Sequence, residues 1–197
     1  MLQDELKIAT RPNHDELENL MFVNEIMNKS LTSSDYAQIL STNYIVHTLL
    51  EPKIQAALGE DIKIALHIDA RFKVAALAAD LKESELDVAA LDLYAGDFEP
   101  KDFTEAHALG ALYVLEGATL GGNVIQKKLR NTPGFEDLGL NYYTVYKDEL
   151  MNRWVSFVQL LNTTDTNDAA VIEGAKYTFD FIASVSRQLA TLVKFVG

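Results

Sequence analysis

Apolar side chains recur at helical spacing along nearly the whole chain, and this feature limits the fold more than any other. Alternating apolar and polar runs, which mark half-buried strands, are hard to find. The 197 residues are 48% hydrophobic, which is enough to bury a sizeable core. No repeat, low-complexity tract or shift in composition marks a domain boundary. The sequence therefore predicts one all-α domain, a multi-helix bundle over residues 1–197.

Capping and turn residues predict where the helices begin and end. Thr10 is suited to cap a helix with Pro12 in its first turn, and Thr32 begins another helix that continues to about Gly59. The other predicted helices cover residues 68–81, 86–93, 102–130, 141–161 and 168 to near the C-terminus. Glycines inside the 102–130 helix indicate that it either continues through them or kinks.

Composition and missing motifs exclude several classes of function. Cysteine is absent, so disulfides and thiolate ligands are excluded. The formal net charge of −12 opposes general binding to nucleic acid or anionic lipid. Phosphate loops, the G-x-S-x-G elbow and the Glu-x-x-His pairs of di-iron bundles are missing. With no basic-then-apolar leader and no apolar run long enough to cross a bilayer, we expect a cytoplasmic protein without membrane contact.

Three glycines lie close together inside the 102–130 helix: Gly117, Gly121 and Gly122. Each glycine in a helix interior costs about 1 kcal/mol relative to alanine, so the three together cost about 2–3 kcal/mol. Close packing between helices would account for them. A bulky planar ligand lying against the helix would account for them equally, and a kink between Gly117 and Gly121 would widen the slot. The glycines alone leave both interpretations open.

His14 is the candidate metal ligand. Glu18 lies four residues later on the same helical face, where it is able to accept a hydrogen bond from the ring nitrogen that does not bind metal. In a continuous helix Lys7 would share this face about 10.5 Å away, close to the span from a heme iron to a propionate. The alternative is an ordinary histidine beside two solvated charges. His47, His67 and His107 are interpreted as having no partner three or four residues later in the chain.

The order of these motifs resembles the heme oxygenase family. The segment Leu6-Lys7-x-Ala9-Thr10-x-x-x-His14-x-x-x-Glu18-Asn19 is similar to the family's proximal helix. The segment Gly117-x-x-x-Gly121-Gly122-x-Val124-Ile125 is similar to its distal helix. Between them, Arg71 and Leu77-Ala78-Ala79-Asp80-Leu81 are similar to the family's arginine and Asp-Leu stretch.

Further residues place the resemblance closer to one bacterial branch, which includes the partners of bacteriophytochromes. They are the segment 112–122, Trp154-x-x-Phe157 and Ala175-x-x-x-Phe179. The resemblance implies an all-α fold that holds heme, both substrate and cofactor, between a proximal helix and a kinked distal helix. It implies cleavage of heme to biliverdin with release of Fe²⁺ and CO. The reaction would use O₂ and electrons from a ferredoxin or a flavoprotein reductase, and a bacteriophytochrome is a candidate acceptor of the biliverdin.

The resemblance also assigns roles to individual residues. His14 would ligate the iron, Glu18 would hold the imidazole, and Lys7 would pair with a propionate. On the distal side the residues carried over are Gly117, Gly121 and Gly122, which let the helix approach heme, together with Thr119 as a hydroxyl donor and Tyr113 as a lining residue. Animal members carry an aspartate directly after the first distal glycine, where this chain has Ala118, so the proton route is undefined.

Two other functions fit the same residues. A non-catalytic heme carrier or sensor of this fold would bind heme without turning it over. A heme-free helical bundle of the thiaminase-like type would not bind heme. For an oxygenase, the basic cluster of Lys127, Lys128 and Arg130 is the first candidate for docking an electron donor, although cations at a helix C-terminus also have an ordinary structural explanation.

Overall fold

The computed structural model describes the backbone of residues 1–196 and the side chains of residues 1–191. The described residues form α-helices and two short 3₁₀-helices, with no strand, so the predicted all-α class is confirmed. In chain order the elements are α1 (Leu2–Ala9), α2 (Arg11–Leu20), α3 (Val23–Asn28), α4 (Ser33–Ala57), α5 (Glu60–Leu66), η1 (Ile68–Arg71), α6 (Val74–Glu83), α7 (Val88–Ala95), α8 (Glu105–Leu120), α9 (Gly122–Leu129), η2 (Lys147–Glu149), α10 (Leu150–Thr163) and α11 (Asp168–Val196).

Local capping signals place some helix ends where the sequence predicts them. Thr32 forms a capping box with Asp35 at the start of α4, each side chain accepting from the other residue's backbone N–H. Thr10 stands at the predicted start of α2, but its hydroxyl does not cap that helix. It donates instead to the carbonyl of Leu6 in α1, at 2.8 Å. The short helices α1, α3 and α5 were not predicted.

Contacts distant in sequence break two predicted helices. The 68–81 helix divides into η1 and α6, because the backbone N–H of Lys73 donates to Glu51 Oε1 at 2.6 Å and not to a helical carbonyl. The 141–161 helix begins only at Leu150. The carboxylate of Asp80 binds the backbone N–H groups of Asn141 at 2.7 Å and Tyr142 at 2.8 Å, which holds that segment as a turn.

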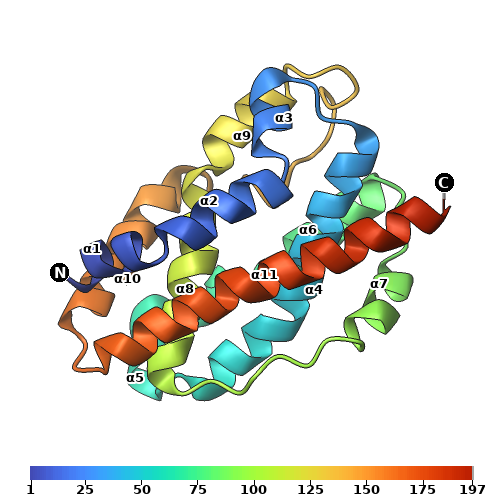
Figure 1. Cartoon of the computed structure of the whole chain (residues 1–197). Helices are drawn as coiled ribbons and strands as arrows, with labels where there is room; N and C mark the ends of the chain where they lie inside the picture. The colour runs from blue at the N-terminus through green and yellow to red at the C-terminus, as the bar shows by residue number, and fades with distance from the viewer. Residues whose placement is uncertain (197) are drawn as a thin grey trace.

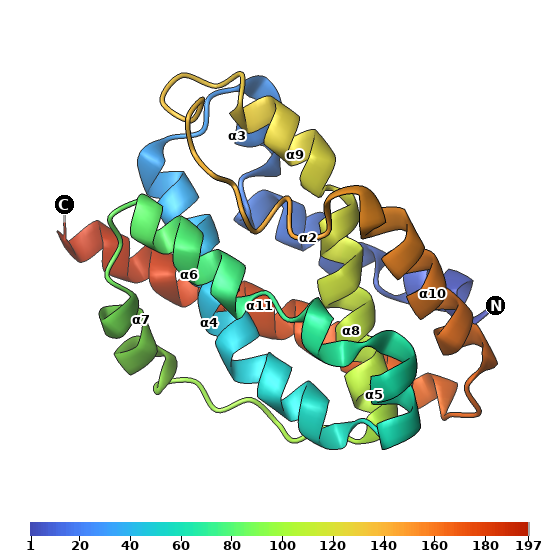
Figure 2. The same cartoon turned by 180° about the vertical axis from the view of Figure 1, so that it is seen from behind.

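The longest helix, α11, packs against α8, α4 and α2 (Figures 1 and 2). The contact with α8 brings two backbones together at glycines. A Cβ atom on Gly110 would lie 2.0 Å from the carbonyl oxygen of Val171, and one on Gly174 would lie 2.3 Å from that of His107. Helix α2 lies beside α11 and packs against it (Figure 1). Helices α2, α8 and α11 therefore frame the region that contains the predicted site residues.

The predicted 102–130 helix is divided into α8 and α9, with Gly121 between them. The combined stretch Glu105–Leu129 is long and apolar enough to cross a membrane, because an 18-residue window within it has a mean hydropathy of 1.3. This corrects the expectation that no apolar run has this length. Half of that window is buried inside the fold, where α8 packs against α11, α4 and α10. A core helix of a soluble bundle passes the same test, so the stretch is weak evidence for membrane insertion.

Candidate functional site

The imidazole of His14 projects from α2 with 56% of its side chain exposed. Its Nδ1 lies 3.7 Å from Glu18 Oε1, and one ring edge faces Phe179 of α11 with the ring centroids 6.2 Å apart. Since Nδ1 faces the carboxylate, Nε2 is the nitrogen available to an external ligand. The arrangement suits an imidazole held in one orientation to bind a metal from outside α2.

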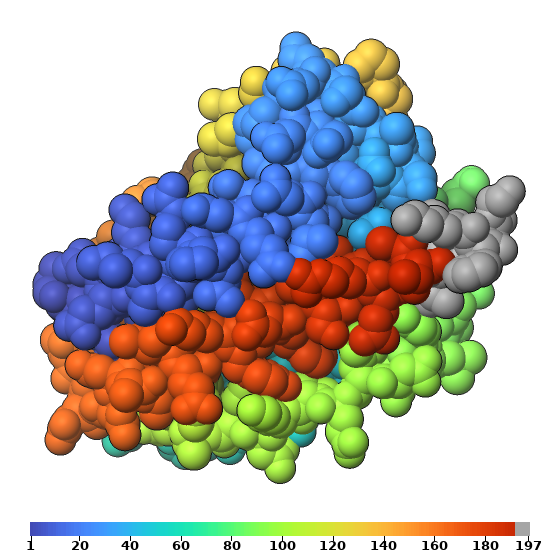
Figure 3. Space-filling view, in the orientation of Figure 1, coloured from blue at the N-terminus to red at the C-terminus, as the bar shows by residue number. Residues whose placement is uncertain are grey.

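Helix α2 is tied to α11 by side chains that flank His14. Asn13 donates through Nδ2 to Asp180 Oδ1 at 2.8 Å, and Glu16 forms an ion pair with Arg187. Leu17 packs against the main core cluster. These contacts fix the side of α2 that meets α11 and leave the imidazole partly exposed (Figure 3 shows this face of the molecule).

Lys7 lies on α1 and not on the helix that carries His14. The helical backbone is interrupted at Thr10, with φ −103° and ψ 2°. Lys7 and His14 therefore do not share the face of one continuous helix. Lys7 is exposed and lines an open hollow together with Asp4, Ile8 and Arg11. Its ammonium group is accessible to an anionic group approaching α1.

The three glycines of the distal segment differ in what surrounds them. A Cβ on Gly122 would lie 2.7 Å from the carbonyl oxygen of Tyr143, so protein packing alone requires glycine there. A Cβ on Gly117 would lie 3.8 Å from the Trp154 ring, and one on Gly121 would lie 3.8 Å from Ile125 Cδ1. Both distances are ordinary van der Waals contacts. Among the described residues, nothing requires Gly117 or Gly121 to lack a side chain, which favours the ligand interpretation for those two positions.

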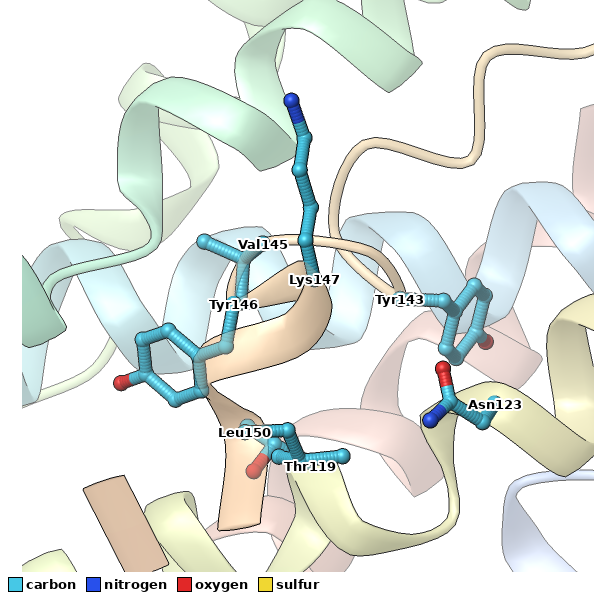
Figure 4. Close-up of a pocket in the computed structure, with 7 residues that line it drawn as sticks. All are labelled: Thr119, Asn123, Tyr143, Val145, Tyr146, Lys147 and Leu150. Carbon is cyan, nitrogen blue, oxygen red and sulfur yellow. The ribbon is translucent and has the colours of Figure 1, made fainter. Parts of the chain in front are cut away.

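Thr119 and Tyr113 face other parts of the protein. The hydroxyl of Thr119 donates to the carbonyl of Glu116 at 2.6 Å, and Thr119 lines a small pocket with Asn123, Tyr143 and Tyr146 (Figure 4). Tyr113 packs against Trp154 with ring centroids 5.9 Å apart. Burial, with a further effect from Asp4, raises the pKa of Tyr113.

A buried charge network holds α8 directly before Gly117, and the sequence analysis missed it. Glu116 accepts from Lys73 Nζ at 2.7 Å and from the Tyr146 hydroxyl at 2.7 Å, and it forms an ion pair with Arg71. Burial alone would raise the pKa of Glu116, but Lys73, Tyr146 and Arg71 outweigh it and lower that pKa. A charged residue in the middle of an apolar helix was the available signal.

His47 is the second feature that the sequence analysis missed. The interpretation that it has no partner was wrong, because Glu51 lies four residues later and binds it. His47 Nδ1 and Glu51 Oε1 are 2.7 Å apart, and both side chains are buried.

A family model for heme oxygenase matches residues 1–188. The chain belongs to the heme oxygenase family. No curated protein sequence matches it. Family membership agrees with the half-exposed imidazole of His14 and with the two glycines that packing does not explain.

Solved heme oxygenases have the same fold. The heme complex of heme oxygenase-1 from Synechocystis sp. PCC6803 matches with a TM-score of 0.74 and 17% identity, over 100% of this chain and 96% of that one. The NO- and CO-bound enzyme from Neisseria meningitidis matches with a TM-score of 0.74 and 21% identity, over 95% and 91%. The enzyme from Leptospira interrogans matches with a TM-score of 0.72 and 17% identity, over 95% and 98%.

The residues of this heme oxygenase fit the group that the family binds. Nε2 of His14 is free to ligate iron, Gly117 and Gly121 present backbone without side chains, and Lys7 offers an exposed cation. Ala118 is exposed and adds no polar side-chain atom to α8. We therefore take α2 on one side and the Gly117–Gly121 stretch on the other as the candidate heme site.

Alanine substitutions should separate the two kinds of glycine in this heme oxygenase. We expect Gly122→Ala to lower the free energy of unfolding by about 1–3 kcal/mol, because its Cβ would overlap the Tyr143 carbonyl. Gly121→Ala should leave apoprotein stability unchanged or raise it by up to about 1 kcal/mol, while weakening heme binding. Urea unfolding of the apoproteins and hemin titration measure the two effects. Unweakened heme binding by Gly121→Ala would contradict the ligand interpretation.

Proposed function

We propose that this heme oxygenase binds heme between α2 and the Gly117–Gly121 stretch and cleaves it to biliverdin, releasing Fe²⁺ and CO. Two glycines, Gly117 and Gly121, that no neighbour among the described residues requires carry this proposal. Both lie on the segment similar to the family's distal helix. The half-exposed imidazole of His14 on α2 supports it. When bound, heme supplies the iron that activates O₂, while the protein supplies ligation, orientation and surroundings.

Each proposed residue has a physical task. His14 ligates iron through Nε2, and Glu18 holds the ring by accepting from Nδ1 directly or through water. Lys7 neutralises a propionate at the edge of the site. Gly117 and Gly121 place no side chain on the distal surface, so that a flat ligand approaches the backbone closely.

The remaining assignments are less direct. Gly122 contributes by letting the Tyr143 turn pack under the start of α9. Tyr113 acts through the Trp154 stack next to Gly117. Thr119 keeps a hydroxyl near the distal segment, although that hydroxyl donates to the Glu116 carbonyl.

The electron donor is proposed to be a ferredoxin or a flavoprotein reductase that docks near the end of α9. Lys127 is exposed there and is the best placed cation. Lys128 donates to the carbonyl of Met27 at 3.2 Å, and Arg130 donates to that of Glu136 at 2.6 Å, so both are partly engaged within the chain. A cytoplasmic location and a bacteriophytochrome as acceptor of biliverdin complete the proposal.

Hemin titration followed by reduction in air tests the proposed function. We expect a Soret band at one equivalent of hemin. Ascorbate or a ferredoxin system should then replace it with the broad red absorption of biliverdin. A Soret band that persists under reductant would favour a heme carrier or sensor. No Soret band would contradict both functions and favour a heme-free bundle.

A further inference from the structure

Residues 140–147 form a buttress turn between α6 and the break in the distal segment. Leu140 and Lys147 stand at its two ends, and both are non-glycine residues in the left-handed region, with φ 53° and 45°. Bulky side chains rarely adopt that conformation, and Leu140 is fully buried. Strained residues of this kind persist only where the surrounding structure holds them. Contacts outside the buttress turn therefore determine its shape.

One buried carboxylate anchors the buttress turn to α6. Asp80 is 1% exposed, and its Oδ1 accepts from the backbone N–H and from Nδ2 of Asn141, each at 2.7 Å. Its Oδ2 accepts the backbone N–H of Tyr142 at 2.8 Å. Hydrogen bonds to an ionised carboxylate are shorter and stronger than neutral ones. Glu83 of α6 also accepts from the backbone of Gly139, at 2.7 Å, but Glu83 is exposed. Asp80 is therefore the main anchor of the turn.

The buttress turn contacts the distal segment on both sides of its break at Gly121. Before the break, the hydroxyl of Tyr146 donates to Glu116 Oε1 at 2.7 Å. After the break, the carbonyl oxygen of Tyr143 lies 2.7 Å from the position that a Cβ on Gly122 would occupy. The small pocket shown in Figure 4 separates the turn from both helices between these contacts. Because the turn meets α8 at one point and α9 at another, its position fixes how α9 continues from α8.

We propose that Asp80 is a positioning residue, which fixes the break at Gly121 through the buttress turn and so selects the bridge of the heme macrocycle that is opened. The inference rests on the proposed function. The bridging carbons of heme are chemically similar, so the one that reacts is decided by how closely the distal surface covers each of them. A change of angle at Gly121 would move that surface, while the proximal contacts of His14 and Lys7 stay in place.

Amide hydrogen exchange of the apoprotein tests the anchor without heme. Asp80→Asn places a donor amide where an acceptor oxygen was, so one of the two backbone N–H groups of the turn loses its partner. We expect the amides of residues 121–126 to exchange at least about tenfold faster than in wild type, while those of α11 keep their rates. Equal acceleration in all helices would indicate a general loss of stability, and unchanged exchange at 121–126 would show that Asp80 does not hold the break. Either result would overturn the inference.

A matched control and a second variant complete this test. Asp87→Asn makes the same substitution in a carboxylate that accepts two backbone N–H groups, those of Ala89 at 3.0 Å and Ala90 at 3.2 Å, but at the start of α7. We expect wild-type exchange at residues 121–126 in this control, and the same acceleration in both aspartate variants would overturn the inference. Tyr146→Phe releases the contact with α8 and should reproduce the local acceleration. Its exchange pattern decides the inference if Asp80→Asn does not fold.

The isomers of biliverdin measure the consequence for turnover. Hemin affinity should stay near wild type by Soret titration, since His14 and Lys7 are unchanged. We expect chromatography to show that the share of minor isomers formed by Asp80→Asn rises about threefold or more. A general loss of stability would lower the amount of active protein without changing that share, so a wild-type isomer ratio in folded Asp80→Asn would overturn the selection of the bridge. An inactive wild type would instead contradict the proposed function, and the exchange pattern would still decide whether Asp80 positions α9.

Discussion

Replacing His14 with alanine should weaken hemin binding more than about 100-fold and abolish biliverdin formation, since it removes the proposed iron ligand. The apoprotein should keep its stability, because the imidazole is half exposed and its neighbour Glu18 is solvated. Soret titration measures the affinity, and formation of the red biliverdin band under reductant in air measures turnover. Imidazole added to the His14→Ala protein should restore part of the Soret band by entering the vacated position.

His67→Asn is the matched control for this change. His67 is exposed and has a φ of 48°, a backbone conformation that asparagine tolerates. We expect hemin binding and turnover to stay at the wild-type level in this variant. Equal loss of the Soret band in both variants would contradict a specific role for His14, and an unchanged band in His14→Ala would remove it as the iron ligand.

Replacing Glu116 with glutamine should lower the free energy of unfolding by about 3–5 kcal/mol, because it leaves the buried cations Arg71 and Lys73 without their common counter-charge. All three side chains are 2% exposed, so water offers little compensation. Urea unfolding of the apoprotein at neutral pH measures the effect. The matched control is Asp102→Asn, which removes an ion pair with Lys53 from a carboxylate that is 96% exposed, and we expect it to leave stability unchanged.

The contribution of Glu116 to the free energy of unfolding should decrease as the pH falls. Its pKa in the folded protein lies below the ordinary value of 4.5, so its contribution is fully present above that value and is lost as the pH falls through the folded pKa. The difference in unfolding free energy between wild type and Glu116→Gln should therefore be full at neutral pH and shrink in acid. A difference that grows as the pH falls would contradict the ionised, cation-bound state of Glu116.

The sequence could predict those features whose cause lies within a few residues. The capping box of Thr32 and Asp35 spans three residues, and the pairing of His14 with Glu18 spans four. The sequence left open whether the 102–130 helix continues through its glycines or kinks, and in the structure the helical path divides at Gly121. The pairing of His47 with Glu51 also spans four residues, so the sequence could have predicted it, but Glu51 was overlooked.

Glycine shows where local information ends. The sequence left close packing and a planar ligand as two explanations for the whole stretch. Neighbours in space separate them, since the Tyr143 carbonyl accounts for Gly122 while Gly117 and Gly121 have room for a Cβ. Composition and spacing carry no information about the carbonyl of Tyr143, 21 residues after Gly122, so only the packed chain assigns each position.

The sequence by itself determined the helical class and the family resemblance, because periodicity, caps and short motifs are local. It also predicted which residues form the proximal and distal segments. Tertiary structure decided the rest through partners distant in the chain. Glu51 accepts the backbone N–H of Lys73, 22 residues away, at the break between η1 and α6. Asp80 holds a turn 61 residues away at Asn141. Lys73 meets Glu116 across 43 residues. Buried charges and buried backbone groups need partners, which the fold supplies from distant parts of the chain. Helical periodicity does not predict these long-range contacts.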